Sequence, residues 1–192
     1  MKRTIFLLLG FLLLSGAYSP STSQAANLVQ NGGFEIGDFT GWTQSGNTGY
    51  TSVQSSFPLS GTFSAFFGPI GSDGFISQAL ATTTGQSYTV SFWLANFIPG
   101  TIEEPNGFHL YWGGSEIFSL LNAPNLGGYT QYSFVAQATS SSTTLSMGFR
   151  NDLDYFILDD VDVSPVPIPG ALVLFGSGLV GLAGISRKWF KK

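Results

Sequence analysis

The chain has 192 residues, a formal net charge of −4 and no cysteine, which excludes disulfides, thiol catalysis and thiolate zinc sites. Two basic residues open the chain and four close it, so Arg150 is the only basic residue among all eleven carboxylates, and this central region carries a formal charge of −10. Nucleic acid is excluded as a partner, because its binding requires clustered Lys and Arg side chains that neutralise phosphates.

The first 26 residues predict a secretory signal peptide with a short helix. A basic start at Lys2 and Arg3 is followed by an apolar run over residues 5–14 and by small residues at Ala25 and Ala26, the order typical of such signals. The alternative is a buried core helix, in which that order of charge, apolar run and small residues has no purpose. We expect cleavage near Ala25 or Ala26, and an exported protein whose folded domain spans residues 27–164.

The central domain is predicted to be all-β. Short runs of β-type residues are separated by Gly, Ser, Thr, Asn and Pro, and no window shows an amphipathic helical period. Residues 87–95, SYTVSFWLA, alternate as a strand with one buried face does. Further strands are expected at residues 74–82, 108–112, 130–138, 144–150 and 155–163. Such spacing favours a sandwich of two sheets.

Two motifs at opposite ends of this domain carry a resemblance to a known fold family. Residues 27–42, NLVQNGGFEIGDFTGW, have the Asn-Gly-x-Phe-Glu and Gly-Trp pattern that opens many galactose-binding-like jelly rolls, and LDDV at 158–161 resembles their last strand. Several carbohydrate-binding module families have this fold. The resemblance implies a jelly-roll β-sandwich with a structural Ca²⁺ between Glu35 and Asp159, and with backbone carbonyls near Gln30 and residues 60–62 as further ligands.

The residues themselves leave two interpretations of Asp159. Alternation along residues 155–163 places it on the same strand face as Tyr155, Ile157, Val161 and Val163. A buried carboxylate requires a cation or several hydrogen-bond donors. Either Asp159 binds calcium as the resemblance implies, or it accepts backbone N–H bonds while Glu35 faces water.

Three side chains are candidates for glycan binding. Trp93 shares a strand face with the small polar Thr89 and Ser91, so its ring is expected on a wetter face, where it can stack on a sugar. Tyr111 and His109 alternate with bulky apolar residues and are expected to join Trp93. The alternative is that the aromatic residues fill the core, since the chain has 18 Phe. Trp42, within the opening motif, is expected in the core.

Catalysis is not expected. His109 is the only histidine, and no nucleophile-elbow motif is present. A glycosidase would require two facing carboxyl groups of unequal pKa. The Glu103–Glu104 pair lies in a Pro/Gly-rich loop and Glu116 follows a turn, which is typical of a solvated surface.

The last segment, residues 165–192, predicts a membrane anchor. The uncharged apolar stretch 170–186 is expected to form a transmembrane helix, and the basic tail 187–192 is expected to stay in the cytoplasm by the positive-inside rule. The domain would then lie outside the cell. The membrane itself is therefore a predicted partner of this segment.

The same segment resembles the PEP-CTERM sorting signal of bacterial exported proteins. The resemblance consists of the motif Val166, Pro167, Ile168, Pro169, the apolar helix and the basic tail that begins at Arg187 and Lys188, although Ile168 stands where the usual motif has Glu. The stretches SGTFSAFFGP, YTVSFWLAN and TQYSF also resemble domains found before such signals. The resemblance implies processing by a membrane-embedded exosortase and release to the surface or to extracellular polysaccharide. The alternative is a plain membrane anchor.

Taken together, these patterns predict a non-catalytic exported protein of the cell surface or extracellular matrix that binds glycans. Two rivals stay open: a purely structural component of an extracellular polymer layer, and a glycan-cleaving enzyme.

Overall fold

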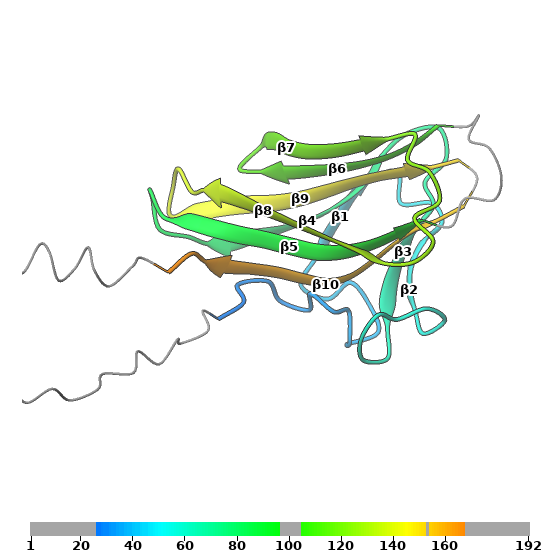
Figure 1. Ribbon diagram of the computed structural model, residues 1–192, viewed down its shortest axis with the longest axis horizontal. Coiled ribbons are helices and arrows are strands. Elements are labelled where there is room, and N and C mark those ends of the chain that lie inside the picture. Colours follow the sequence, from blue (N-terminus) through cyan, green and yellow to red (C-terminus); the bar gives the residue numbers. More distant parts are fainter. Residues whose placement is uncertain (1–25, 97–104, 153, 168–192) are drawn as a thin grey trace, which may run out of the picture.

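The computed structural model describes residues 26–96, 105–152 and 154–167, which form a sandwich of two antiparallel five-stranded sheets (Figure 1). We call them sheet A and sheet B. Sheet A has the order β1-β4-β9-β6-β7. Its strands are β1 (Thr43–Gly46), β4 (Gly74–Ala81), β9 (Ser142–Asn151), β6 (Asn106–Trp112) and β7 (Ser115–Leu121).

Sheet B has the order β2-β3-β10-β5-β8. Its strands are β2 (Thr51–Gln54), β3 (Ser64–Phe67), β10 (Phe156–Pro165), β5 (Ser87–Asn96) and β8 (Thr130–Gln137). The described residues contain strands, turns and loops and no helix. The all-β prediction is confirmed.

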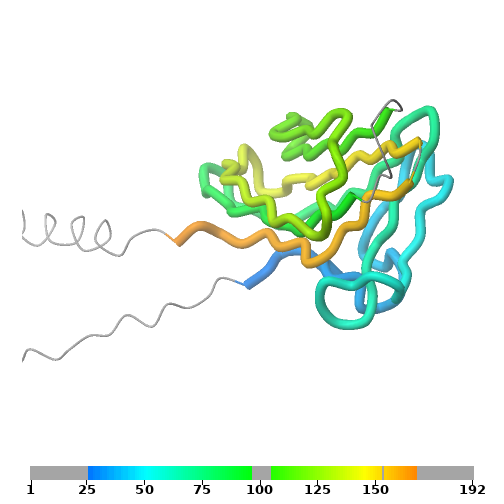
Figure 2. The backbone as a smooth tube through the Cα atoms, turned by 45° about the vertical axis from the view of Figure 1, so that its right-hand side comes forward, coloured from blue at the N-terminus to red at the C-terminus, as the bar shows by residue number. Residues whose placement is uncertain are grey.

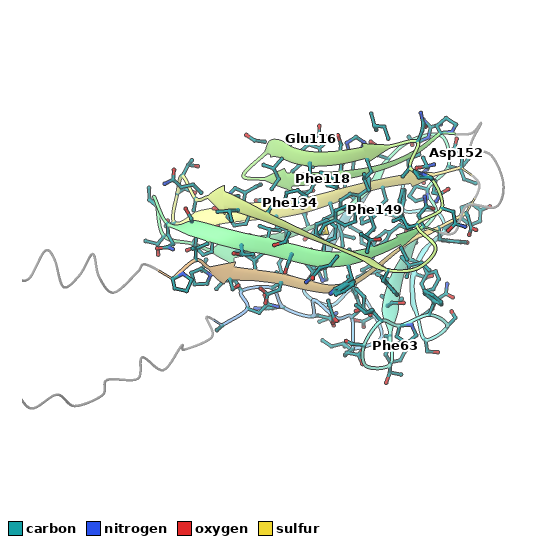
Figure 3. The ribbon with its side chains drawn as sticks, in the orientation of Figure 1. Phe63, Glu116, Phe118, Phe134, Phe149 and Asp152 are labelled. Atoms are coloured by element: carbon teal, nitrogen blue, oxygen red, sulfur yellow. The ribbon has the colours of Figure 1, made fainter. Side chains whose placement is uncertain are left out.

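Aromatic and aliphatic side chains fill the space between the sheets. Along β5, Tyr88, Val90, Phe92 and Leu94 are buried at alternate positions, as the sequence predicts. Phe149 of β9 lies at the middle of the core, where its ring stacks on that of another phenylalanine, Phe67 of β3, with the centroids 3.8 Å apart (Figure 3). Each fully buried side chain of this size contributes about 1.5–3 kcal/mol to folding through the removal of apolar surface from water.

A β-bulge in β10 changes which residues face the core. The pairing of β10 with β5 shifts between Asp159 and Asp162, and Asp160 has a φ of 49°. After the bulge Val161 and Val163 point into the core with Phe156 and Leu158, whereas Asp159 stays on the outer face of sheet B with Ile157 and Tyr155. The expectation that all five alternating residues share one face is therefore wrong, because the extra residue reverses the alternation.

The opening segment of the domain lies along β10. The Leu28 N–H donates to the Val163 carbonyl (2.8 Å), and the Asn27 side chain bonds to Val161 and Val163. Trp42 is buried, as expected, and its ring stacks on Phe34. Both ends of the described chain therefore leave the sandwich side by side (Figure 2).

Three tight turns lie at this same end of the sandwich (Figure 1). They connect β4 to β5, β6 to β7 and β8 to β9. The first and third are joined by backbone bonds from Gly85 N to the Ala138 carbonyl (2.8 Å) and from Thr82 N to the Ser141 carbonyl (3.0 Å). Gly113 N, in the second turn, donates to the Thr144 carbonyl of β9 (2.9 Å). The turns are therefore held against one another.

Several sequence predictions fall outside the described residues. The signal peptide, the 170–186 helix and the basic tail are among them, together with Ile168, Pro169, Arg187 and Lys188. Within the part of the chain that the structure describes, no helix is long and apolar enough to span a membrane. Val166 and Pro167 are described: Val166 N donates to the Ser87 carbonyl (2.8 Å), and Pro167 is exposed.

Candidate functional site

A cavity of about 650 Å³ lies on the outer face of sheet A. Two aromatic rings, Phe75 of β4 and Tyr111 of β6, lie on it with their centroids 6.3 Å apart. Between these strands runs β9, which contributes the hydroxyl groups of Thr144 and Ser146. The glycine turn between β6 and β7 and the turn between β8 and β9 complete the lining. The cavity thus combines apolar ring surface with neutral hydrogen-bonding groups.

The position of Phe75 depends on a glycine in the neighbouring strand. Gly148 of β9 pairs with Phe75 of β4, and a Cβ atom at position 148 would come within 2.6 Å of the Phe75 ring. Because no side chain projects from Gly148, the ring lies over the backbone of β9. The sequence analysis missed Phe75. Phe75 and Ser77 lie on one face of β4 and Ile76 on the other, so this alternation could have indicated an outward-facing ring.

His109 and Glu116 lie beside Tyr111. His109 Nδ1 is 3.0 Å from Glu116 Oε1, and the His109 ring stacks on that of Tyr111 at 6.2 Å between centroids. The hydrogen bond from His109, assisted by one from Ser119, lowers the pKa of the Glu116 carboxyl. Burial, with smaller effects from the charges of Glu116 and Asp73, raises the pKa of the Tyr111 phenol, so the phenol is neutral at physiological pH.

Trp93 lies on the other side of the molecule. It belongs to β5 in sheet B, where it is half-buried on the outer face with Thr89 and Ser91. Its neighbours across the strands are Asp159 of β10 and Gln131 of β8. The structure therefore brings Tyr111 and His109 together but separates both from Trp93, which the sequence grouped with them.

The two predicted calcium ligands hold one loop, residues 55–63, through its backbone. Asp159 Oδ2 accepts the N–H groups of Leu59 (2.9 Å) and Ser60 (3.3 Å), and its Oδ1 accepts the N–H of Asp160 (2.8 Å). Glu35 Oε1 and Oε2 both accept the Thr62 N–H (3.0 and 2.8 Å), and Oε1 also accepts the Phe63 N–H (3.0 Å). Figure 3 labels Phe63 in this loop, which lies away from the end of the sandwich where the described chain begins and ends.

The carboxylates of the two predicted calcium ligands take part in protein hydrogen bonds, and calcium binding stays a prediction. All four carboxylate oxygens of Glu35 and Asp159 accept backbone N–H groups, and a carboxylate oxygen has a second lone pair besides the one that such a bond uses. A side chain on Gly61 would overlap the Glu35 carboxylate. No group of three or more His, Cys, Asp or Glu that could hold a metal ion occurs in the described ranges. Asp159 accepts backbone N–H bonds, as the alternative interpretation expects. Glu35 is exposed, and it also accepts hydrogen bonds from the loop at residues 55–63.

Burial of Asp159 is complete, and it raises the pKa of this carboxyl above its ordinary value. The N–H bonds from Leu59, Asp160 and Ser60 act in the opposite direction, and the nearby Asp160 charge raises the pKa further. The loop also receives a bond from Tyr129, whose hydroxyl donates to the Phe57 carbonyl (2.8 Å). Desolvation is the main cause that raises the pKa of Tyr129 to about 12.

Comparison by sequence finds no matching family model and no matching curated protein. Comparison by structure finds similar folds. A family 61 carbohydrate-binding module, TmCBM61, solved in complex with β-1,4-galactotriose, is 19% identical with a TM-score of 0.59, and the match covers 74% of this chain and all of that one. The CBM22-1 xylan-binding domain of Paenibacillus barcinonensis Xyn10C is 16% identical with a TM-score of 0.54, over 76% of this chain and 97% of that one.

Enzymes also share this architecture. The Stig cyclase Fisc from Fischerella sp. TAU is 13% identical with a TM-score of 0.56, over 76% of this chain and 99% of that one. Identities this low establish the fold and leave the ligand open. The described domain therefore has the jelly-roll β-sandwich fold of carbohydrate-binding modules, as the opening motif and the last strand led us to expect.

Proposed function

We propose that this protein is a non-catalytic glycan-binding protein, and that its site is the cavity on the outer face of sheet A. The single observation that carries the proposal is the pair of rings, Phe75 and Tyr111, 6.3 Å apart at the edge of a cavity lined with Ser and Thr hydroxyls. Aromatic faces stack on the apolar faces of sugars, and neutral hydroxyls bond to sugar hydroxyls. The carbohydrate-binding modules of similar fold support this choice of ligand.

The proposal that the protein is not an enzyme rests on the carboxyl groups. A glycosidase acid needs a raised pKa, so that it is protonated at working pH. Glu116, which pairs with Tyr111 across β6 and β7, has a lowered pKa because His109 bonds to it. Release of reducing sugar from a bound polysaccharide, abolished by Glu116→Gln, would contradict this part of the proposal.

The first prediction concerns affinity. Native affinity gels with β-1,4-galactan and with xylan are expected to retard the protein. Phe75→Ala and Tyr111→Ala are each expected to weaken binding about tenfold or more, the equivalent of at least about 1.4 kcal/mol. Trp93→Ala is the matched control, because it removes an outward-facing ring from the opposite sheet.

The outcomes separate the rival functions. Loss of binding with Trp93→Ala alone would move the site to sheet B. An unretarded protein on a panel of polysaccharides would favour a purely structural role in a polymer layer.

We also propose that the protein is exported and is sorted by its C-terminal segment, either anchored in the membrane or released after cleavage by an exosortase-type enzyme. The support is the tripartite layout of residues 165–192, together with the extracellular polysaccharide that the proposed site would bind. The second prediction is that the intact mass of the mature protein lacks residues 1–26 in every envelope or extracellular fraction. A released form shortened at the C-terminus supports sorting, and a full-length, uncleaved chain in the cytosol contradicts export.

A further inference from the structure

A second cavity, of about 270 Å³, lies between the edge strands of the two sheets. β7 is the last strand of sheet A and β8 the last of sheet B, so neither has a neighbour on its outer side among the described strands. Ile117 of β7 and Val135 of β8 line the cavity, and so do the polar residues Ser115 and Gln137. Val135 pairs with Thr89 of β5, so its side chain lies at the rim of the cavity on the side of sheet B. Farther along, the rings of Phe118 and Phe134 close the space between the strands, with centroids 4.7 Å apart (Figure 3).

The two cavities meet at the β6–β7 turn. Three residues line both of them: Gly113, Thr139 and Thr143. Gly113 and Gly114 have φ angles of 58° and 84°, which favour glycine, and around the missing Cβ of Gly114 there is no atom within 4 Å. The glycines of the turn therefore place no side chain of their own between the cavities, which adjoin at Gly113, Thr139 and Thr143. We call the two adjoining cavities the groove.

The lining of the whole groove is uncharged. Neither cavity is lined by an Asp, Glu, Lys, Arg or His side chain, although the central region of the chain has a formal charge of −10. Its lining residues provide apolar surface together with hydroxyl and amide groups. Such a lining suits a neutral ligand with apolar faces and many hydroxyls, and it offers no partner to an anionic one.

We propose that this groove takes a continuous stretch of a neutral polysaccharide, with one part of the chain on Phe75 and Tyr111 and the next part passing over the β6–β7 turn to Ile117 and Val135. The proposal rests on the proposed function and deepens it, because it makes the ligand an extended chain and not a single terminal sugar. The edge cavity is then a second subsite, occupied only by longer oligosaccharides.

The test measures affinity against chain length. Isothermal titration of the whole protein uses β-1,4-galacto-oligosaccharides and xylo-oligosaccharides, from single sugars to hexasaccharides. For whichever series binds, affinity is expected to rise at least about tenfold between the trisaccharide and the hexasaccharide. Polygalacturonate, an anionic chain, is expected to bind more weakly than neutral β-1,4-galactan.

Two matched variants locate the second subsite. Val135 and Leu121 are both exposed, at 69% and 66%, but only Val135 lines the groove. Val135→Glu is expected to remove the gain in affinity from chain length and to leave the trisaccharide unchanged. Leu121→Glu, a similar change on neighbouring β7, is expected to leave both affinities unchanged.

The failures are distinguishable. An affinity that stops rising at the trisaccharide, or a hexasaccharide affinity that Val135→Glu leaves unchanged, overturns the extended groove while Phe75→Ala still reports on the proposed function. Absence of binding at every length in both series contradicts the proposed function and this inference with it.

Discussion

Asp159 is the most completely buried carboxylate of the described residues. Three backbone N–H groups donate hydrogen bonds to it. Two of its three N–H partners belong to Leu59 and Ser60, about a hundred positions earlier in the chain. Hydrogen bonds to a charged group contribute about 1.5–3 kcal/mol each, roughly twice the usual net value. The side chain therefore ties the loop at residues 55–63 to the last strand of sheet B.

The third prediction concerns this side chain. Asp159→Asn replaces one acceptor oxygen with an NH₂ group that faces an N–H donor, so the free energy of unfolding is expected to fall by about 1–3 kcal/mol. Asp162→Asn makes the same chemical change on the same strand and is expected to cost less than about 0.5 kcal/mol. Chemical denaturation of both variants checks the difference, and equal costs would show that the loop bonds contribute nothing.

The same variant has a defined pH dependence. Burial raises the pKa of Asp159, so above an unfolded value of about 3.9 the native state keeps a proton that the unfolded state has lost. By linkage, the contribution of Asp159 to stability is largest at low pH and falls as the pH rises through this window. The stability difference between wild type and Asp159→Asn is therefore expected to shrink with rising pH. Growth of the difference would contradict a raised pKa.

At the scale of the strand, β10 shows what alternation can and cannot predict. A strand at residues 155–163 is confirmed, and so are the strands at 74–82, 87–95, 108–112, 130–138 and 144–150, within a few residues. The bulge at Asp160 was not predicted, because one inserted residue leaves no mark on composition. Strands β1, β2, β3 and β7 were also missed. The first three have only four residues each, and β7 has no fully buried residue to mark an alternating face.

The bulge supplies the fourth prediction. Asp160 has a φ of 49°, and its carboxylate accepts a bond from the Ser60 hydroxyl (2.9 Å). A β-branched side chain is strained in this region, so Asp160→Val is expected to destabilise the protein by at least about 1–2 kcal/mol. Asp160→Asn, which tolerates this φ, is expected to stay close to wild type. A melting temperature for Asp160→Val equal to that of Asp162→Val would argue against backbone strain.

At the scale of the whole molecule, two carboxylates from distant parts of the chain hold the loop at residues 55–63 by hydrogen bonds. The resemblance predicts calcium, whereas every oxygen of the two proposed ligands accepts a backbone N–H. The fifth prediction follows from this geometry: EDTA leaves the melting temperature unchanged, and added Ca²⁺ does not raise it. A fall in EDTA that Ca²⁺ reverses, and that Asp159→Asn abolishes, would establish the calcium site instead.

The sandwich also decides how many separate surfaces the protein can offer. Its two outer faces point in opposite directions, so an aromatic residue on sheet A and one on sheet B cannot contact the same short ligand. The loop at residues 55–63 covers part of the outer face of sheet B, where Phe66, Ala95 and Ile157 form a small buried cluster. The cavity of about 650 Å³ lies on the face of sheet A.

The sequence by itself determined the all-β class, most of the long strands, the burial of Trp42 and the outward direction of Trp93, Tyr111 and His109. These properties are local, because successive side chains of a strand point to opposite faces. Only the tertiary structure decided which outward residues share a surface: it placed Phe75 with Tyr111 over Gly148 and put Trp93 on the opposite sheet. The order of strands depends on pairing between distant segments, and no local pattern records which sheet a strand will join.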